Sequence, residues 1–500
     1  MKEPHFTLKK AVSRALTPEN WAGLFALFLM SAFILWVPET GYSSIVGPKH
    51  NLFLLSCAVF FPVLLGLMLR KREKPKKGQL ICLALAGGLL ILFLLSSVLS
   101  QYQDTVWLGA RRHEGFLTLA LYLLLFSAMA LWGKVGRAHF IVISLTSILV
   151  FALAAMQFAG KNPLNLYPND LTFHDRNLRY SGEYLSTIGN SDLLSAFLTM
   201  AFLFQAGAYA AGKAKAWILP GAFCAWMCLL LSEVTAGPVA ILGCLVICLI
   251  PCLRYGIGVK AVGDIAFLLL LGLLCKSMLG YRYADGSLTF FLRFGGLQIG
   301  LLVCTLLMLI PGRLLRDKAH PKAAMVLALS YVGLFLAGYL FLFFYRGSNE
   351  KLQALHLLAR FDPPDTLGSS RIRIWKEALT LGKEMPLLGS GPDTYRFRST
   401  IIFTSTTGTY RQTSVDVAHS EYLNLWVNTG LPSMLLFMGL IGCAVIPALH
   451  KPNRSTLPLL LPALGYAIHA LFGISQSVVS PLFYLFLGAL VYACNRDYNF

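Results

Sequence analysis

The sequence predicts an all-α, polytopic membrane protein with about fourteen (12–14) transmembrane helices. Three observations lead to this fold class. Hydrophobic residues make up 56% of the 500 residues and charged residues only 13%, with a mean hydropathy of +0.66, which is far from the composition of soluble domains. Largely uncharged runs of membrane-spanning length recur along the whole chain. A single long polar segment, residues 346–418, holds ten Lys and Arg.

The candidate spans follow one another with short polar or basic segments between them. In chain order they cover residues 21–39, 50–69, 78–99, 115–132, 138–159, 191–211, 215–232, 236–253, 261–280, 294–311, 322–345, 420–447, 456–475 and 479–494. Residues 215–253 are the least regular part, because only the segment from Ser232 to Ala236 separates two apolar blocks. This stretch is compatible with two spans or with a broken, re-entrant pair.

Three regions of one integrated membrane domain follow from these spans: an N-terminal multi-span region at 1–345, a large outer loop at 346–418, and C-terminal membrane helices at 419–500. Within the loop, residues 352–360 and 371–379 have the pattern of short amphipathic helices, the second of them lying in or over the membrane surface. The first, together with residues 404–409, is either a lid over a lipid-side cleft or a solvated connector.

The distribution of basic residues predicts the orientation in the membrane. With the N-terminus inside, the inner segments carry 23 Lys and Arg and the short outer loops about 8, as expected when basic loops stay cytoplasmic. The protein is therefore predicted in the plasma (inner) membrane with both termini cytoplasmic and the 346–418 loop outside. The net charge of +19 then reflects topology and contact with anionic lipid headgroups, and no nucleic-acid partner is expected.

The polar chemistry is concentrated on the predicted outer side. Ionisable residues are nearly absent from the centres of the spans, which argues against ion-coupled transport. Nucleotide-activated donors are cytoplasmic, and the chain has no Asp-x-Asp, Walker A or Gly-x-Ser-x-Gly motif. A lipid-pyrophosphate donor fits an outward-facing enzyme. Transfer from such a donor needs a base and cations, with no obligatory metal and no cofactor.

His419 is the leading candidate for the base. It stands where the polar loop re-enters an apolar helix, with Ser420 or Asp416 as the N-cap. The helix dipole disfavours the imidazolium and attracts anions such as pyrophosphate. An interfacial His that only caps the helix is the structural alternative.

Arg371 is the leading candidate for a phosphate-binding cation. It lies in the first turn of the 371–379 helix, after Ser369 and Ser370, and a guanidinium fork matches phosphate oxygens. An arginine in contact with solvent or lipid headgroups is the structural alternative. The glycines of the following segment, Pro386 to Tyr395, are typical of a helix stop.

Together these residues resemble a known family. Arg371 with Trp375, then Pro386-Leu387-Leu388-Gly389-Ser390-Gly391-Pro392, then His419-Ser420 and Gly430 are similar to the C-terminal region of the O-antigen ligase and O-antigen polymerase family, here about residues 220–445. Two weaker signatures stand upstream, at 111–116 and 189–192. The resemblance implies a metal-independent glycosyltransferase that moves glycan from an undecaprenyl-pyrophosphate-linked donor to a glycan, lipid or protein acceptor on the outer membrane face.

By the same resemblance, His419 is expected to activate the acceptor and Arg371 to hold the pyrophosphate, with Trp375 and Gly430 at the substrate site. One departure concerns the stretch around Ala236, which lacks an arginine that many family members carry there. The arginines that are candidates to replace it in substrate binding are Arg112, Arg179 and Arg373. His469 contacts either the lipid linker or only its helical neighbours.

Two other functions remain compatible with the sequence. A lipid-linked oligosaccharide flippase would have a similar number of spans, but it should line an interior cavity with charges, and the spans contain few. A catalytically inactive scaffold of a polysaccharide-assembly complex is suggested by the missing arginine near Ala236. It would leave His419 and Arg371 replaceable. Polymerase and ligase are not separated by the sequence.

Overall fold

A computed structural model of the chain describes residues 17–70, 74–167, 184–284, 302–303, 305–306, 308–309, 312–315, 318–405 and 411–496. The all-α prediction is confirmed. Nine described helices are long and apolar enough to cross a membrane, and four shorter apolar helices accompany them. The predicted number of about fourteen is not confirmed, and the predicted span at 294–311 lies largely outside the described residues.

The helices of the first half of the chain follow the predicted spans closely. They are α2 (Pro18–Met30), α3 (Ala32–Leu35), α4 (Val46–Arg70), α5 (Lys77–Val98), α6 (Gln103–Val106), α7 (Phe116–Trp132), α8 (Arg137–Phe158), α9 (Ser191–Ala210), α10 (Leu219–Leu231) and α11 (Ala236–Tyr255), with 3-10 turns at Gly41–Ser43 and Ala216–Ile218. The predicted first span is divided at Ser31, where the backbone leaves the helical region. Residues 215–253 form two helices, α10 and α11, joined by a short turn.

The second half contains more short elements. They are α12 (Val259–Ala284), α14 (Pro321–Phe343), α15 (Glu350–Ala359), α16 (Arg371–Glu384), α17 (Tyr395–Arg398), α18 (Glu421–Thr429), α19 (Leu431–His450), α20 (Leu457–His469) and α21 (Ser480–Asn495). Two antiparallel strands, β1 (Ile402–Ser405) and β2 (Arg411–Ser414), pair Ile402 with Ser414. This hairpin is a departure from the helical prediction, as is the end of α20 at His469 rather than near residue 475.

The predicted span at 420–447 is wrong as a single helix. Gly430 has a φ of +90° and separates α18 from α19. A Cβ on this residue would lie 2.1 Å from the carbonyl oxygen of Leu387, so only glycine allows the two segments to approach. The apolar residues on both sides hide this break, because only Asn428 and Thr429 separate Val427 from Gly430.

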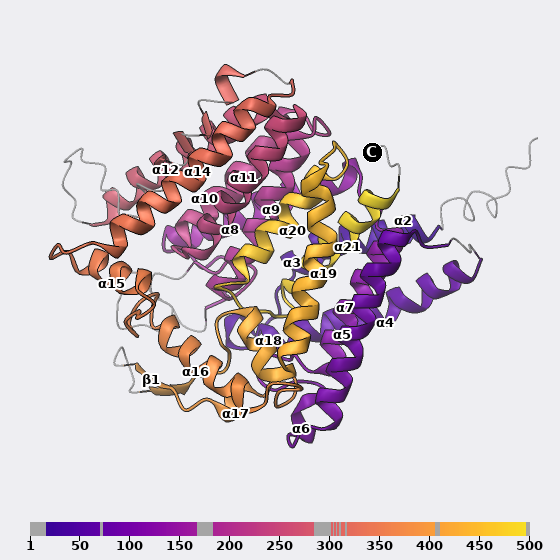
Figure 1. Cartoon of the computed structure of the whole chain (residues 1–500). Helices are drawn as coiled ribbons and strands as arrows, with labels where there is room; N and C mark the ends of the chain where they lie inside the picture. Colours follow the sequence, from indigo (N-terminus) through magenta and orange to yellow (C-terminus); the bar gives the residue numbers. More distant parts are fainter. Residues whose placement is uncertain are drawn as a thin grey trace, which may run out of the picture.

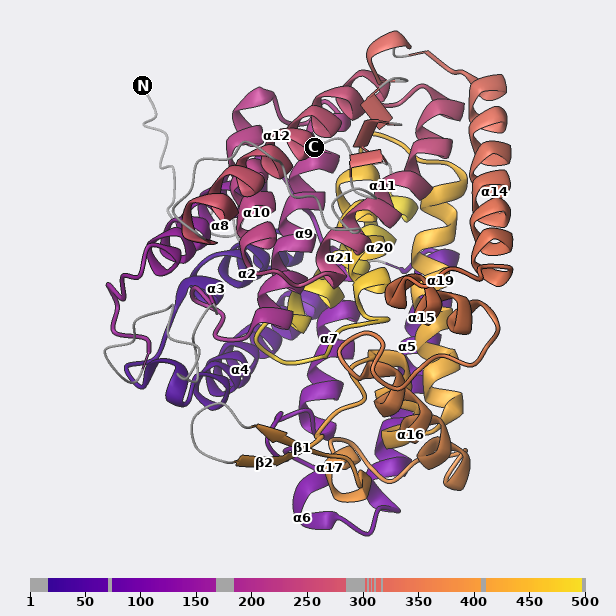
Figure 2. The same cartoon turned by 90° about the vertical axis from the view of Figure 1, so that its left-hand side faces the viewer.

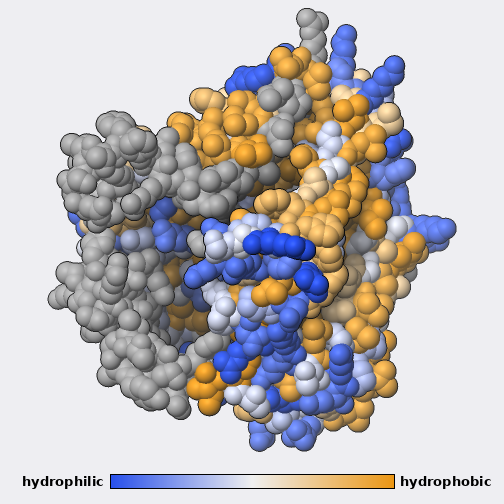
Figure 3. Space-filling view, turned by 60° about the vertical axis from the view of Figure 1, so that its left-hand side comes forward, coloured by the Kyte–Doolittle hydropathy of each residue, from blue (hydrophilic) through white to orange (hydrophobic). Residues whose placement is uncertain are grey.

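The helices form a bundle with a separate layer at one end. The layer contains α15 to α18 and the hairpin. In Figure 1, α16, α17, α18 and the hairpin lie in the lower part, away from the C-terminal end of α21, and α15 lies higher at the left-hand edge. It has its own small core, which brings together Ile374, Ala378, Leu381, Tyr395, Ile401, Val415, Ala418 and Val427. We call this part, residues 350–429, the loop layer. In Figure 3, hydrophilic side chains gather on the lower part of the visible face and hydrophobic ones on the upper and right-hand parts.

Burial divides the bundle into a centre and a periphery. The helices α9, α20 and α21 are almost completely buried, and most of the buried apolar side chains belong to one large core. The helix α14 stands at the edge (Figure 2), and none of the 18 residues of its most apolar window is buried. Its surface is therefore suited to contact with lipid.

Candidate functional site

His419 lies directly before α18, at the junction of the loop layer and the bundle. Its φ is +47°, in the left-handed region that non-glycine residues adopt at a cost. Two contacts fix the start of α18 on the end of α20: the Glu421 N–H donates to the Ala470 carbonyl at 2.9 Å, and the Tyr422 hydroxyl donates to the Ala467 carbonyl at 2.8 Å. Ser420 is the N-cap, as expected, but its side chain makes no capping hydrogen bond.

Asp192 brings His419 and Arg371 together. Its Oδ2 lies 3.8 Å from Nδ1 of His419, and its Oδ1 lies 3.4 Å from Nη2 of Arg371. Asp192 is in the first turn of α9, where Asn190 caps the helix by accepting from the Leu193 N–H. An acidic residue is stabilised at this position by the helix dipole. Sequence analysis placed Asp192 in a weak signature and gave it no role, because no local pattern connects it with His419.

Arg371 is the first residue of α16, as predicted, although the Ser370 side chain makes no capping hydrogen bond. The apolar face of α16 packs on α18, where Gly382 lies against the Trp426 ring. One turn after Arg371, the Trp375 ring lies 6.0 Å from the ring of Phe472, in the segment after α20. Arg373 is exposed on the other face of the helix.

A second arginine stands close to His419. Arg112 forms a two-point ion pair with Asp416, through Nε at 3.0 Å and Nη2 at 2.9 Å. Burial alone would raise the pKa of Asp416, but the hydrogen bonds and charge of Arg112 bring that pKa below its usual range. Of the two proposed replacements that lie within the described residues, Arg112 and Arg373, it is Arg112 whose charge acts on His419, together with that of Arg371. Arg179 lies outside the described residues.

Burial and charge together keep the His419 imidazole neutral. Burial lowers the pKa of His419 below its usual range, Asp192 opposes this shift, and Arg371 and Arg112 add to it. The proximity of Nδ1 to Asp192 favours a proton on Nδ1, which leaves Nε2 able to accept one. This arrangement is suited to a general base near neutral pH.

A polar cleft of about 580 Å³ adjoins these residues. Its walls come from the start of α4 and the segment before it, from the loop before α7, and from the start of α9. The lining residues are Tyr42, Ser43, Ser44, Ile45, Val46, Gly47, Arg111, Arg112, His113, Leu185, Gly189, Asn190, Ser191, Asp416 and Gln476. Because Asp416 and Ser191 line the cleft, it lies directly beside the Asp192–His419 pair.

The region around Ala236 also lies near the site. A Cβ on Gly237 would meet the Ser195 hydroxyl at 2.5 Å, and that hydroxyl lies 3.2 Å from Nε2 of the buried His469. The start of α11 is thus pressed against α9 one turn after Asp192, with no room for a longer side chain at Gly237. A cation beside the preceding turn is Lys276, whose Nζ lies 2.9 Å from Glu233.

The residues described by the structure include no group of three or more His, Cys, Asp and Glu arranged to hold a metal ion. The family comparison matches residues 220–438 to the O-antigen ligase family. The chain carries an O-antigen ligase domain. Arg371, His419 and Gly430 fall within the matched residues, whereas Arg112 and Asp192 precede them. A search of curated proteins finds no match.

The O-antigen ligase domain and the membrane-length helices identify a multi-pass membrane protein of polysaccharide biosynthesis. The match supports a ligase-like or polymerase-like activity. The matched domain contains Arg371 and His419 but only part of the site. The Asp192 carboxylate and most of the cleft walls come from helices outside the matched region, so the site is completed by the N-terminal part of the bundle.

Within the O-antigen ligase domain, the segment Pro386–Pro392 holds the loop layer to the bundle. Within the layer, the main-chain N–H groups of Ser390 and Gly391 donate to the carbonyls of Val427 and Asn428 at the end of α18, at 3.2 and 2.7 Å. On the other side, the Ser96 hydroxyl of α5 donates to the Leu388 carbonyl at 2.6 Å. Gly430 belongs to this packing against Leu387 and is not among the residues that line the cleft.

Asp393, which follows this segment, fixes the wall of the cleft. Its Oδ2 accepts from the N–H groups of Ala110 at 2.6 Å and Glu114 at 3.4 Å, and so it holds both ends of the loop that carries Arg111 and Arg112. Burial raises the pKa of Asp393 to about 6.

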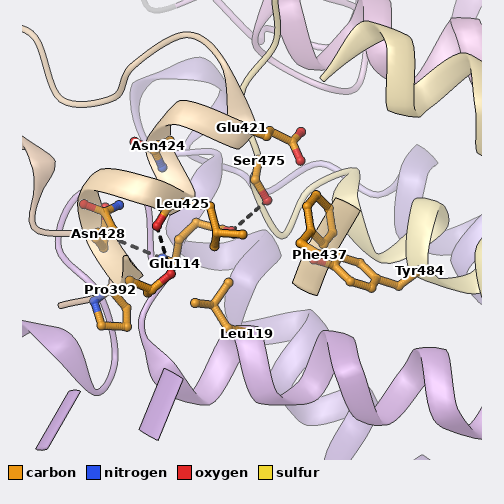
Figure 4. A pocket seen from close by; sticks show the side chains of 12 residues that line it. Glu114, Leu119, Pro392, Glu421, Asn424, Leu425, Asn428, Phe437, Ser475 and Tyr484 are labelled. Carbon is orange, nitrogen blue, oxygen red and sulfur yellow. Dashed lines mark hydrogen bonds between the residues drawn. The ribbon is translucent and has the colours of Figure 1, made fainter. Parts of the chain in front are cut away.

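The O-antigen ligase domain also contributes to a buried acidic pocket of about 40 Å³ (Figure 4). Glu114 accepts from Ser475 at 2.8 Å, and Glu421 accepts from Tyr466 at 2.5 Å. The hydroxyl of Ser480 lies within 3.1 Å of both Ser475 and Tyr466 and joins the two halves. Burial raises the pKa of Glu114 to about 7 and that of Glu421 to about 8. No sequence pattern had indicated this pair.

Proposed function

We propose that the protein is a metal-independent glycosyltransferase that transfers glycan from an undecaprenyl-pyrophosphate-linked oligosaccharide to an acceptor hydroxyl on the outer membrane face. The acceptor is a glycan or a lipid. The observation that carries this proposal is the convergence of His419, Asp192, Arg371 and Arg112 beside a polar cleft. Transfer from a pyrophosphate donor requires a base for the acceptor hydroxyl and a cation for the departing pyrophosphate.

The reaction assigns one task to each group. The acceptor oxygen forms a bond to the anomeric carbon of the donor glycan, and the proton of that hydroxyl goes to Nε2 of His419. The bond between the anomeric carbon and the phosphate oxygen breaks, and its electron pair leaves with the lipid pyrophosphate. The guanidinium of Arg371 stabilises the charge that develops there. Asp192 orients His419 and stabilises the imidazolium that forms.

The proposed orientation places the loop layer outside and both termini in the cytoplasm. The donor then approaches from the outer leaflet with its lipid between helices and its pyrophosphate at Arg371. This arrangement keeps the charged part of the donor in the polar end of the molecule and the polyprenyl chain beside apolar helices.

Transfer of native lipid-linked glycan, measured by product gels in membranes, tests the proposal. Asn accepts the left-handed backbone of residue 419 better than Ala does, so His419→Asn removes the base with little disturbance of the fold. We expect a loss of transfer of about 10²-fold or more. His450→Asn, at the exposed opposite end of α19, is the matched control. A chelator such as EDTA should leave wild-type transfer unchanged.

The outcomes separate the possible functions. Normal transfer by the His419→Asn protein refutes the base assignment and favours a scaffold. Loss of transfer together with loss of lipid-linked glycan from the outer leaflet favours a flippase. Loss of transfer with the donor still present outside supports the enzyme, and a ladder of products rather than a single product identifies a polymerase.

A further inference from the structure

The cleft beside His419 is lined by several polar side chains, and Arg371 is not among its lining residues. Its rim is built from Ser43, Ser44, Asn190 and Ser191, whose hydroxyl and amide groups are the partners that sugar hydroxyls use. Its volume of about 580 Å³ falls within the range of small-molecule sites, roughly 300–1,000 Å³. The cleft therefore has the size and the chemistry of a saccharide site.

The charges on its walls do not cancel. Of the charged residues that line the cleft, Arg112 is neutralised by its two-point pair with Asp416. The side chain of Arg111 is exposed, and its charge acts on Asp416 without forming a direct pair among the described contacts. His113 is stacked on His50, with ring centroids 4.8 Å apart, and burial lowers its pKa, so it adds no charge near neutral pH. One positive charge, that of Arg111, is left over.

The position of the cleft relative to Arg371 separates it from the donor. Arg371 reaches Asp192 from α16 in the loop layer, whereas the cleft is formed by the start of α4, the loop before α7 and the start of α9. His419 interacts with both sides, with Asp192 and Arg371 on one and with Arg112 and Asp416 on the other. A hydroxyl bound in the cleft and a pyrophosphate bound at Arg371 would meet at the imidazole.

We propose that this cleft is the acceptor site and that it selects an acceptor saccharide carrying an anionic group, a carboxylate or a phosphate, through Arg111. The assignment of the bound sugar as acceptor rests on the proposed glycosyltransferase function; the selection of an anionic saccharide does not. A guanidinium binds both anionic groups with paired hydrogen bonds, and the surrounding hydroxyl and amide groups bind the neutral part of the sugar.

A binding measurement without donor tests this proposal. The purified full-length protein in lipid nanodiscs is titrated with two oligosaccharides that differ only in the terminal residue, glucuronate or glucose. We expect the acidic probe to bind the wild type about tenfold more tightly. Arg111→Gln should remove this preference without changing the Kd of the neutral probe. Lys383→Gln, which removes an exposed cation of α16 away from the cleft, should keep it.

Two further variants distinguish the failure of this proposal from the failure of the proposed function. His419→Asn should keep the preference for the acidic probe, because it removes the base and not the site. The wild type could prefer the acidic probe and yet transfer no glycan. This result would support the saccharide site and refute the enzyme assignment. Equal binding of both probes by the wild type, or a preference abolished by Arg371→Gln and not by Arg111→Gln, would overturn the cleft assignment.

Discussion

Oδ2 of Asp192 lies 3.8 Å from Nδ1 of His419, although the two residues belong to distant parts of the sequence. The same carboxylate reaches Arg371 with its other oxygen, at 3.4 Å. Asp192 therefore neutralises the charge of Arg371 and also raises the pKa of His419. If a pyrophosphate binds Arg371 as proposed, it replaces one partner of Asp192 and leaves the carboxylate to His419 alone.

Replacement of Asp192 by Asn should weaken the base. Asp192 raises the pKa of His419 against the effects of burial and of the arginines, so its loss lowers that pKa further. The acidic limb of the pH profile of kcat should move to lower pH, and kcat on the plateau should fall about tenfold or more. The profile is measured with membranes and saturating donor. Asp365→Asn, in an exposed pair with Lys376, should leave the profile unchanged; an unshifted profile for Asp192→Asn would show that this carboxylate does not act on the base.

Replacement of Arg371 should weaken donor binding in two steps. Arg371→Lys keeps the charge but loses the planar fork, and Arg371→Gln loses both. We expect the KM for the lipid-linked donor to rise about fivefold for Lys and about 50-fold for Gln. The KM for the acceptor should stay the same. A rise in the KM for the acceptor alone would show that the pyrophosphate does not bind at Arg371.

The buried pair of glutamates makes stability depend on pH. Burial raises the pKa of Glu421 from 4.5 to about 8 and that of Glu114 to about 7. A carboxyl whose pKa is raised by folding contributes stability that is fully present below about pH 4.5 and is lost as the pH rises through about 8. The unfolding temperature of the wild type should therefore fall between about pH 5 and about pH 9.

Glu421→Gln tests this dependence, because Gln is neutral at every pH and can still accept from Tyr466. The unfolding temperature of this variant, measured by scanning fluorimetry in detergent, should fall less steeply with pH. Glu114 and Asp393, whose pKa values burial also raises, contribute to the remaining slope. Glu350→Gln, at the exposed start of α15, is the control and should follow the wild type. A steeper fall for Glu421→Gln would contradict the assignment.

Gly430→Ala should destabilise the joint between α18 and α19. The new Cβ would lie 2.1 Å from the Leu387 carbonyl oxygen, and the φ of +90° is unfavourable for Ala. We expect a loss of roughly 2–4 kcal/mol of stability. Gly439 lies inside α19 with open space around it, so Gly439→Ala should be neutral or stabilising by about 0.5–1 kcal/mol. Thermal unfolding of both variants provides the comparison.

Sequence patterns predicted the membrane helices well where apolar runs had polar ends. The run at 191–211 became α9 at Ser191–Ala210, and the run at 236–253 became α11 at Ala236–Tyr255. Sequence patterns failed where a contact between distant residues determines the local structure. Nothing in the run from 420 to 447 reveals that the Leu387 carbonyl packs against Gly430, and the pairing of Ile402 with Ser414 arises in polar segments without a clear alternating pattern.

Sequence patterns predicted part of the candidate site. His419 and Arg371 stand at helix starts that the sequence marks, and the structure places both near one carboxylate. Asp192 and the glutamate pair were missed for a physical reason. Their role depends on side chains that meet across α7, α9, α18 and α20, and hydropathy carries no information on such long-range pairing.

Two hydrogen bonds between the loop layer and the bundle join main-chain atoms: the Glu421 N–H donates to the Ala470 carbonyl, and the Leu431 N–H donates to the Pro386 carbonyl. Side-chain replacement does not remove such bonds, so the loop layer can keep its position while most of its surface residues are substituted. Substitution is limited at Gly389 and Gly430, where an added Cβ would lie 2.4 and 2.1 Å from backbone atoms of Asn428 and Leu387. If the cleft binds a saccharide as proposed, its wall residues can change while the main-chain contacts that hold the His419 imidazole remain the same.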